Sequence, residues 1–548
     1  MSTIGPSPTP PEGQIAIVYN LVPMPEAAGV AAGEGELRGI ALATRDGVTA
    51  YLPADRTHEL SEIGDLPRLY PDALLARAVE QRYGLPTGGP ADCLRTLLRL
   101  TSVSPNREKL LYRPDLAIKR AEKAFTEYDE RMGFFDDGRE CVYRSIELPT
   151  IEVTEEIIHN GLLLDIDGLE AFRAIQKETI DRTRREINAA TPRPINPRSS
   201  GQVAGLLYGE LGLPVNRRTR NGHPSTGAEA LRPITDRHPV ILPLVVHQKA
   251  VTLHQRANEL LSAVSPETGR VHTHLDPLGA ATGRFTSRNP AVQNLPPEIL
   301  HFVTAPDGHV LLEADFSQIE LRVLAAVSEE PRLLAAFAED DVDLHRLAAA
   351  ASLKIDPESV TDQQRKLGKQ MNFAIVYGQR AAGLAESLGI SVEESEELIT
   401  AYFQAHPRVR DWIDHTHAHM ATRWCVRSMY GRRRLLQPYD DPTSPLHREL
   451  ERRAVNTVIQ GSAADILKFA LIRLHRELPP DVRLVLTVHD SVVLEVPADR
   501  VEQVRHQVVA VMETSPPGFA VPLRVDVSTG RTWAECKCRS QTREHVAV

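Results

Sequence analysis

The beginning of the sequence has no feature that would direct the chain into or across a membrane. Residues 1–14 are rich in proline, contain no lysine or arginine, and lead into no long apolar segment. A signal peptide needs a basic start and an apolar core, and a membrane anchor needs about 20 apolar residues. We therefore predict neither a signal peptide nor an anchor, and interpret residues 1–14 as a short flexible tail.

Cysteine is scarce, which limits the kinds of stabilising site that the chain can build. There are five cysteines in 548 residues: Cys93, Cys141, Cys425, Cys536 and Cys538. Their scatter argues against a disulfide framework and favours a reducing, cytoplasmic location. The pair Cys536 and Cys538 lacks partners for a zinc site.

An excess of positive charge is also missing, because 63 lysines and arginines stand against 73 aspartates and glutamates, a net charge of −10. Binding to nucleic acid would be easier to infer from a basic total, yet local charge can serve the same purpose. Compact basic groups do occur: Arg182, Arg184 and Arg185; Arg217, Arg218 and Arg220; Arg432, Arg433 and Arg434; Arg452 and Arg453. Taken singly, each group is more simply interpreted as a solvated surface.

The length and the patterning predict several structural units. A chain of this length exceeds one compact core, so two to four units are expected. Residues from about 14 to 140 suggest a small α/β unit, with strands at 13–20 and 38–53, a turn at Asp46-Gly47, and a helix ended by Gly84. Long amphipathic helices fill residues 145–270, and strands then alternate with helices to the end.

The first segment with chemical interest is HVLLEADFSQIELRVLAAV, residues 309–327. Its apolar start predicts a strand that passes into a helix, which places Asp315 where the strand ends. A carboxylate at that point is suited to a hard cation such as Mg²⁺. The simpler alternative is that Asp315 only caps the following helix.

A second segment, residues 359–380, predicts a helix that begins with a capping box of Thr361 and Gln364 and ends at Gly378. Two cations and two aromatics then recur every four residues as one stripe: Arg365, Lys369, Phe373 and Tyr377. Between the first cation and the first aromatic the rise is about 12 Å, comparable with the reach from a triphosphate to its base. The alternatives are core packing for the aromatics and a solvated face for the cations.

The third segment, VRLVLTVHDSVVLEV at residues 482–496, predicts two antiparallel strands joined at His489-Asp490-Ser491. If this hairpin shares a sheet with the strand at 309–316, Asp490 faces Asp315. Two carboxylates converging on two divalent ions suit in-line displacement at phosphorus. A plain polar turn is the alternative.

In this order, the segments DFSQIELR, RKLGKQMNFAIVYG and VHDS resemble the three signature motifs of family A DNA polymerases. The similarity runs from about residue 141 to 537 and includes TGRFTSRNPAVQNLP, DLHRLAAA and ERRAVNTVIQGSAADILK. It implies an α+β, right-hand fold. The implied parts are a reduced 3′–5′ exonuclease-like domain at 1–140, a helical thumb at 141–275, an antiparallel-sheet palm at 276–330 and 441–548, and helical fingers at 331–440.

The resemblance also implies a role for each matching residue. Metal ligands would be Asp315, Asp490 and the carbonyl of Phe316, and Lys369 would protonate the departing pyrophosphate. The incoming nucleotide would be bound by Arg365, Lys369, Phe373, Tyr377, His345, Gln318 and Glu320. Glu320 would exclude the 2′ hydroxyl. The primer terminus and minor groove would be followed by Arg284, Arg452, Asn456, Gln460 and His489.

The implied activity is template-directed DNA synthesis in replication or repair, with two Mg²⁺ ions, or Mn²⁺ in their place. The implied partners are primer-template DNA and deoxynucleoside triphosphates, with no membrane and a monomeric, nucleoid-associated enzyme. Rival functions are a single-subunit RNA polymerase of the phage type, a catalytically silent DNA-binding accessory protein, and an enzyme that retains 3′–5′ exonuclease activity.

Several positions depart from the family pattern. Ser491 stands where the family usually has glutamate, and Phe316 and Val458 replace tyrosine and proline. The first strand of the N-terminal region, IAIVYNLV, lacks the acidic pair that a 3′–5′ exonuclease needs, and no Tyr-x-x-x-Asp follows where expected. We therefore predict that proofreading is lost, and that this length leaves no room for a 5′ nuclease domain.

Overall fold

The computed structural model describes five strands between residues 15 and 93, then residues 141–219, 221–339, 342–437, 439, 441 and 444–538. The chain forms two compact units. The first contains Met1–Asn160, His274–Ser287 and Leu312–Val527, and the second contains Gly161–Thr273, Arg288–Leu311 and Ser528–Val548.

The N-terminal strands form one five-stranded sheet in the order β3-β2-β1-β4-β5. Its members are β1 (Ile15–Val22), β2 (Glu36–Thr44), β3 (Thr49–Pro53), β4 (Arg68–Tyr70) and β5 (Ala91–Cys93). Strands β1, β2 and β3 pair antiparallel, whereas β4 pairs parallel with β1 and with β5. The predicted strands are confirmed, while the turn at Asp46-Gly47 and the helix ended by Gly84 lie outside the described residues.

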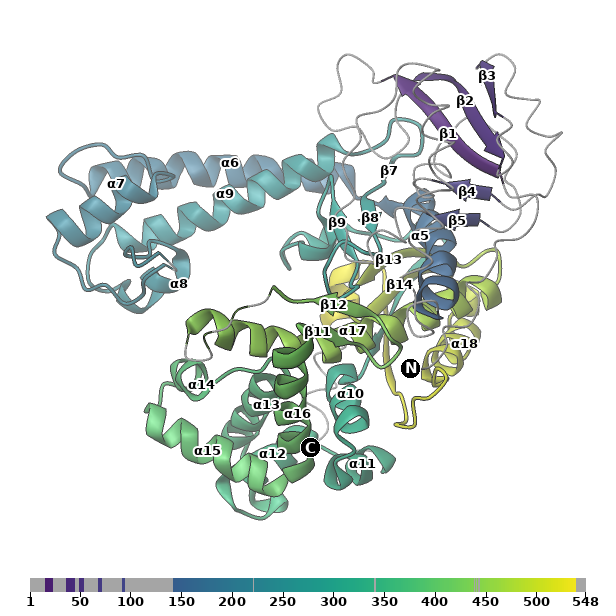
Figure 1. The fold of residues 1–548 in the computed structure, drawn as a ribbon. Helices are drawn as coiled ribbons and strands as arrows, with labels where there is room; N and C mark the ends of the chain where they lie inside the picture. Colours follow the sequence, from purple (N-terminus) through teal and green to yellow (C-terminus); the bar gives the residue numbers. More distant parts are fainter. Residues whose placement is uncertain are drawn as a thin grey trace. The chain divides into compact units, whose positions relative to one another are not determined.

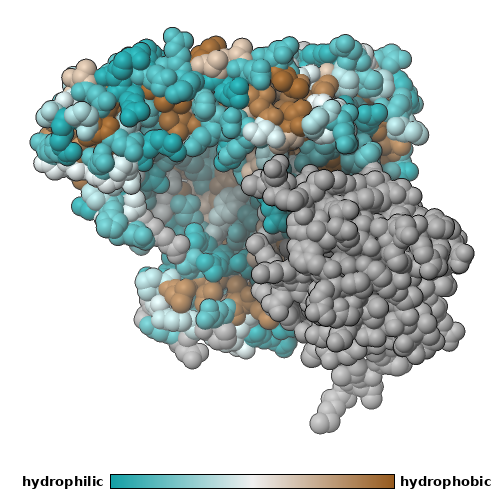
Figure 2. Space-filling view, turned by 90° about the horizontal axis from the view of Figure 1, so that it is seen from above, coloured by the Kyte–Doolittle hydropathy of each residue, from teal (hydrophilic) through white to brown (hydrophobic). Residues whose placement is uncertain are grey.

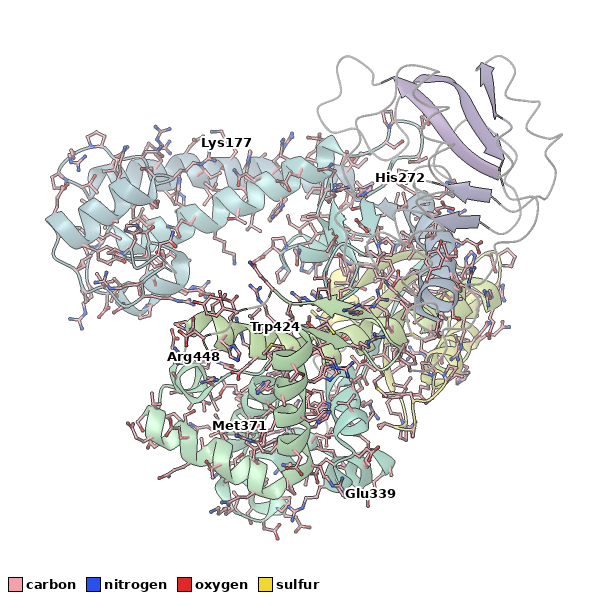
Figure 3. All side chains as sticks on the ribbon, viewed as in Figure 1. Lys177, His272, Glu339, Met371, Trp424 and Arg448 are labelled. Carbon is pink, nitrogen blue, oxygen red and sulfur yellow. The ribbon has the colours of Figure 1, made fainter. Side chains whose placement is uncertain are left out.

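The second unit is built on two long helices that pack along each other, α6 (Ile166–Ala189) and α9 (Ile241–Ser262) (Figure 1). The carboxylate of Asp165 accepts a hydrogen bond from the amide of Gly168 and so caps the start of α6. Lys177, labelled on α6 in Figure 3, pairs with Asp181 one turn later at 3.0 Å. The shorter elements are β6 (Leu162–Leu163), α7 (Ser200–Ala204), η3 (Gly205–Glu210), α8 (Ala228–Leu231), η4 (Arg232–Ile234), β7 (Arg270–Val271), η5 (Val292–Asn294) and η6 (Leu300–Phe302).

The first and third segments singled out in the sequence form a four-stranded sheet with β15, in the order β13-β14-β10-β15. Its strands are β13 (Arg483–Val488), β14 (Ser491–Pro497), β10 (His309–Phe316) and β15 (Val525–Gly530). Residues such as Leu312, Leu484 and Leu494 are fully buried, as expected of strands covered by helices. Helix α5 (Leu148–Asn160) packs on β13, and α17 (Pro445–Glu477) packs on α5 and on α18 (Val501–Glu513).

The remaining helices of the first unit run consecutively along the chain. They are α10 (Ile319–Ser328), α11 (Pro331–Ala338), α12 (Leu344–Leu353), α13 (Asp362–Val376), α14 (Ala381–Leu388), α15 (Val392–Ala405) and α16 (Pro407–Arg423). Met371, labelled in Figure 3, is fully buried within this group. Helices α12 and α13 pack closely at Gly368. A Cβ atom at this position would lie 1.9 Å from the carbonyl oxygen of His345. Only glycine permits this approach.

Smaller elements complete the first unit: η2 (Val142–Glu147), β8 (His274–Asp276), β9 (Thr286–Arg288), η7 (Pro357–Ser359), β11 (Cys425–Arg427), β12 (Arg433–Leu435) and η8 (Ala498–Arg500). The α+β fold class is confirmed. The domain boundaries given by the resemblance stay predictions, although η2 and α5, predicted as part of the thumb, pack in the first unit.

The surface gives no sign of a membrane segment in the described part of the chain. No helix there combines the length and the hydrophobicity that crossing a bilayer requires. On the face drawn in Figure 2, the described residues are mainly hydrophilic, and hydrophobic side chains form small separate patches.

Candidate active site

Asp315 lies near the end of β10, and Asp490 lies in the turn that leads into the neighbouring strand β14. Asp315 is the penultimate residue of β10, and Asp490 is one of two turn residues between β13 and β14, where Val488 pairs with Ser491. The backbone amide of Phe316 donates to the carbonyl oxygen of Asp490 at 3.2 Å. This bond brings the two acidic residues, far apart in sequence, to the same end of the inner strands β10 and β14.

The simpler interpretations of these aspartates do not fit the structure. The N-cap of α10 is Gln318, in the left-handed region with φ 54°, so Asp315 does not cap that helix. Asp490 is not a plain polar turn residue, because its carboxylate is largely buried and Oδ1 accepts a hydrogen bond at 3.2 Å from Nη2 of Arg284. Asp315 therefore precedes the helix cap, and Asp490 is paired with an arginine and not simply solvated.

Arg284 joins Asp490 to Glu320. The same Nη2 atom donates to Oε1 of Glu320 at 2.7 Å, and at most about one fifth of each of the three side chains is exposed. Burial raises the pKa of Asp490 despite the opposing charges of Arg284 and His489. Burial also raises the pKa of Glu320, against the Arg284 charge and together with the Asp490 charge. A further cation nearby would stabilise the ionised form of these carboxylates.

Tyr377 completes this group from the end of α13. Its hydroxyl is hydrogen-bonded to the carboxylate of Glu320, and burial followed by the negative charge of Glu320 raises the pKa of Tyr377 to about 12. The hydroxyl therefore stays protonated near neutral pH. The next residue, Gly378, has φ +60° and ends the helix as predicted, and an added Cβ would lie 3.2 Å from Cα of Arg452.

Helix α13 carries the stripe predicted from the sequence. Its start is a complete capping box of Thr361 and Gln364. Phe373 is 44% exposed, so core packing does not explain it, and its ring stacks on that of Tyr377 with centroids 6.1 Å apart and planes within 9°. The opposite face is buried through Met371 and Ile375. Phe373 is thus the exposed member of the stripe, and Arg365, Lys369 and Tyr377 are half-buried.

His345 lies at the start of α12, facing the same helix. It is buried, its Nδ1 is 3.1 Å from the amide nitrogen of Asn372, and its ring centroid is 6.4 Å from that of Phe373. Because the Asn372 amide nitrogen can only donate, this contact favours the tautomer of His345 in which Nδ1 accepts.

Arg365 is held by Asp343, the N-cap residue of α12. Oδ2 of Asp343 accepts from Nε of Arg365, while Oδ1 accepts from the amides of His345 and Arg346 at 3.0 Å each. The predicted phosphate-binding cation is therefore already paired with a carboxylate.

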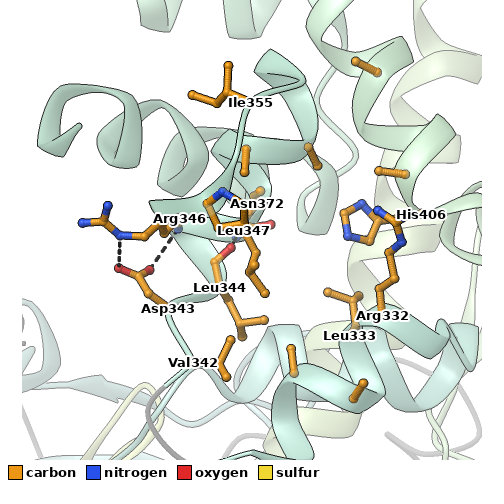
Figure 4. Close-up of a pocket in the computed structure, with 18 of the residues that line it drawn as sticks. Arg332, Leu333, Val342, Asp343, Leu344, Arg346, Leu347, Ile355, Asn372 and His406 are labelled. Atoms are coloured by element: carbon orange, nitrogen blue, oxygen red, sulfur yellow. Dashed lines mark hydrogen bonds and ion pairs between the residues drawn. The ribbon is translucent and has the colours of Figure 1, made fainter. Parts of the chain in front are cut away.

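Figure 4 shows Asp343 and Arg346 joined at the side of a cavity of about 1070 Å³ that is lined in part by α12.

The third helix of the site is α17, on which Arg452, Asn456 and Gln460 follow each other at intervals of four. This spacing places them on one side of the helix. Three side chains of the predicted site also carry buried polar atoms that find no hydrogen-bond partner among the described residues: Nε of Arg284, Oε1 of Gln318 and Oδ1 of Asn456. Buried polar atoms normally have partners, which water or a bound molecule would supply here and at the other such atoms of the described chain.

The donor atoms at this end of the two strands fit a hard divalent cation. Carboxylate oxygens from Asp315 and Asp490, with the carbonyl oxygen of Phe316, are the ligands that Mg²⁺ prefers. Within the described residues no group of three or more His, Cys, Asp or Glu side chains is placed to hold a metal ion. Mg²⁺ held by one or two carboxylates keeps positions for water and substrate phosphates.

The sequence did not predict one buried cluster of charged side chains. Arg432, interpreted above as solvated, is buried, and its Nε donates to Oδ1 of Asp465 at 2.9 Å. Lys468 donates to Oε1 of Glu147 at 2.6 Å, and burial lowers the pKa of Lys468 to about 8 although Glu147 acts against it. The available signal was the presence of Asp465 and Lys468 within the apolar run 463–472.

Comparison with known proteins decides the family. A sequence model described as DNA polymerase family A matches residues 166–535. The chain belongs to this family. Among its relatives, DNA polymerase I of Thermus filiformis is 36% identical over 72% of this chain and 48% of its own length. That of Thermus aquaticus is 31% identical over 91% of this chain and 61% of its own length.

A solved family A structure matches the fold closely. The POL domain of Pol1 from M. smegmatis, in complex with DNA primer-template and dNTP, has a TM-score of 0.84 at 26% identity. The match covers 95% of this chain and 96% of that one. By contrast, this family A chain spans about half the length of the first relatives that it matches.

Proposed function

We propose that this chain is a template-directed DNA polymerase that adds deoxynucleotides to a primer 3′ hydroxyl by phosphoryl transfer assisted by two divalent cations. The observation that carries the proposal is the backbone hydrogen bond from Phe316, the residue after Asp315, to Asp490, which brings the end of β10 beside the turn that carries Asp490. Membership of the family supports it, as does the likeness to a domain solved with primer-template and dNTP.

Asp315, Asp490 and the carbonyl of Phe316 would hold two Mg²⁺ ions, with Mn²⁺ as a substitute. Such ions, when bound, activate the attacking 3′ oxygen and stabilise the charge on the leaving pyrophosphate. Arg284 keeps the carboxylate of Asp490 in place through Oδ1 while leaving Oδ2 available. The protein's contribution is mainly positioning and fixed charge, as is usual in phosphoryl transfer.

Helix α13 would bind the incoming nucleotide along its stripe. Arg365 and Lys369, near the positive end of the helix, would neutralise the triphosphate, and Lys369 would donate a proton to the departing pyrophosphate. His345 would donate a further hydrogen bond from Nε2. The exposed ring of Phe373, stacked on Tyr377, offers the sugar and base a flat surface.

Selection of the deoxy sugar is assigned to the group made by Glu320, Tyr377 and Arg284. Two hydrogen bonds fix the Glu320 carboxylate, one from each partner. A side chain held this firmly cannot move aside for a 2′ hydroxyl. This favours deoxynucleotides and argues against the RNA polymerase alternative.

The primer terminus and minor groove would be followed by Arg284, Arg452, Asn456, Gln460 and His489. The minor groove presents acceptor atoms in every base pair, so donors there sense pairing geometry without reading sequence. The unpartnered Nε of Arg284 is such a donor. Gln318 would meet the nucleotide with its unpartnered carbonyl.

Extension of a labelled primer with Mg²⁺ tests the proposal. We expect the wild-type chain to extend a matched primer, and Asp490→Asn to lose at least about 1000-fold in rate, the order seen when a group essential to charge stabilisation is removed. Asp499→Asn, which changes an exposed carboxylate in the same part of the chain, is the matched control. Equal rates for Asp490→Asn and wild type would exclude the role of Asp490.

The rival functions give different outcomes in the same experiment. A silent accessory protein would bind primer-template without extending it. A retained 3′–5′ exonuclease would shorten a mismatched primer in the absence of deoxynucleotides, and this activity would persist in Asp490→Ala. We expect extension and no shortening.

A further inference from the structure

Ser491, directly after Asp490, is bonded to a carboxylate from the neighbouring strand. Its hydroxyl lies 3.0 Å from Oε1 of Glu313 and 3.0 Å from the carbonyl oxygen of Val488, so its one hydrogen is shared between these acceptors. Ser491 and Glu313 are 1% and 3% exposed. A carboxylate buried this deeply needs a reason, because its removal from water is costly.

The position of Glu313 connects it to the proposed catalytic pair. Glu313 precedes Asp315 by two residues on β10, and alternate residues of a strand point to the same face, about 7 Å apart along it. Through Ser491 it is also bonded to the residue that follows Asp490. One buried carboxylate thus lies two residues from Asp315 on the same strand and is hydrogen-bonded to the residue that follows Asp490.

We propose that Glu313 is a positioning residue for the divalent cations, supplying from β10 the auxiliary negative charge that Ser491 cannot supply from β14. This inference rests on the proposed function. Glu313 would act in two ways: its charge adds to the field that attracts the cations, and its bond to Ser491 fixes the turn that carries Asp490. Outer groups of this kind orient metal ligands and tune their affinity.

The test measures metal binding as well as activity. Mn²⁺ binding is followed by electron paramagnetic resonance on the full chain, bound to a primer-template whose primer ends in a dideoxynucleotide, with the matching dNTP present. Glu313→Gln should weaken Mn²⁺ binding about 10-fold or more, the usual cost of removing an outer partner of a metal ligand. The Mg²⁺ concentration for half-maximal extension should rise by a similar factor.

Two further variants separate positioning from folding. Glu495→Gln removes another buried carboxylate from β14, four residues and about 13 Å from Ser491 along the strand, and should leave Mn²⁺ binding unchanged. The exchange variant Glu313→Ser with Ser491→Glu moves the charge to the other strand. Its Mn²⁺ affinity should lie within about threefold of wild type, whereas that of Glu313→Gln should be about 10-fold weaker.

The outcomes distinguish this inference from the proposed function. If wild type extends primers but Glu313→Gln binds Mn²⁺ as wild type does, or no more weakly than Glu495→Gln, the inference is wrong and the polymerase stands. If Glu313→Gln does not fold, the exchange variant decides, because a folded exchange variant with weak Mn²⁺ binding contradicts the inference. Failure of wild type to extend primers would remove the proposed function itself.

Discussion

Replacing Asp343 by asparagine should release Arg365 for the incoming nucleotide. The two carboxylate oxygens have separate roles: Oδ1 caps α12, and Oδ2 pairs with Arg365. Asparagine caps helices about as well as aspartate, so Asp343→Asn keeps the first role and removes the charge from the second. In the wild-type chain the triphosphate must compete with this carboxylate for the guanidinium.

The size of the effect follows from how exposed the pair is. Both side chains are 27% exposed, between a surface ion pair and a buried one. Exposed pairs contribute about 0.2–1 kcal/mol and charge-assisted hydrogen bonds somewhat more, so we take about 1 kcal/mol. Without this competition the Kd for a deoxynucleotide should fall about fivefold, since 1.4 kcal/mol corresponds to a factor of about ten. The variant should be less stable by about the same free energy.

The same pair predicts a dependence of stability on pH. Burial alone would raise the pKa of Asp343, but hydrogen bonds from the Arg365 side chain and the Arg346 amide, with the Arg365 charge, lower it overall. A lowered pKa means that the stabilisation is present above the unfolded value, about 3.9, and is lost as the pH falls towards the folded value. The unfolding free energies of wild type and Asp343→Asn should therefore differ at pH 7 and converge below about pH 4.

Nucleotide binding is measured by titrating dNTP into the enzyme on a primer-template with a dideoxy-terminated primer. Asp356→Asn is the control, because Asp356 caps the short helix η7 through the amide of Glu358 at 2.9 Å and undergoes the same chemical change. Tighter binding confined to Asp343→Asn supports the competition. Unchanged or weaker binding would refute it, and would mean that Asp343 orients Arg365 for the nucleotide.

Two more changes test other parts of the site. Glu320→Ala should raise ribonucleotide incorporation relative to deoxynucleotide roughly 10- to 100-fold, the usual range for one steric contact, in a competition assay; an unchanged ratio would remove Glu320 from sugar selection. Lys468→Met should lower the unfolding free energy by about 3–5 kcal/mol in urea titrations, because Glu147 and Asp465 would keep their buried charges with one cation fewer. A loss below about 1 kcal/mol would contradict that account.

Local patterns carried the predictions that succeeded. The capping box at Thr361, the helix end at Gly378 and the hairpin around Asp490 each depend on a few adjacent residues, and all are present in the structure. The pairing of β10 with β14 could be stated only as a condition, since no local signal sets which strands become neighbours.

Contacts between distant residues were beyond the reach of sequence patterns. Arg284 meets Asp490 across 206 positions, and Arg432 meets Glu147 across 285. A charged residue in the sequence looks solvated unless its partner is known, and for Arg432 this led to the wrong interpretation. The link between Ser491 and Glu313 was missed for the same reason, because it forms only once the sheet is assembled.

The strand order β13-β14-β10-β15 has a consequence for synthesis on the ribosome. Glu313 of β10 and its partner Ser491 of β14 are 178 residues apart, an interval of roughly 10–35 s at typical translation rates. Throughout that time β10, which ends with both edges paired, leaves the ribosome with neither partner strand yet made. Its unpaired apolar edges are a hazard for aggregation. During synthesis the earlier helices, or a chaperone, would have to cover β10 until β14 and β15 emerge.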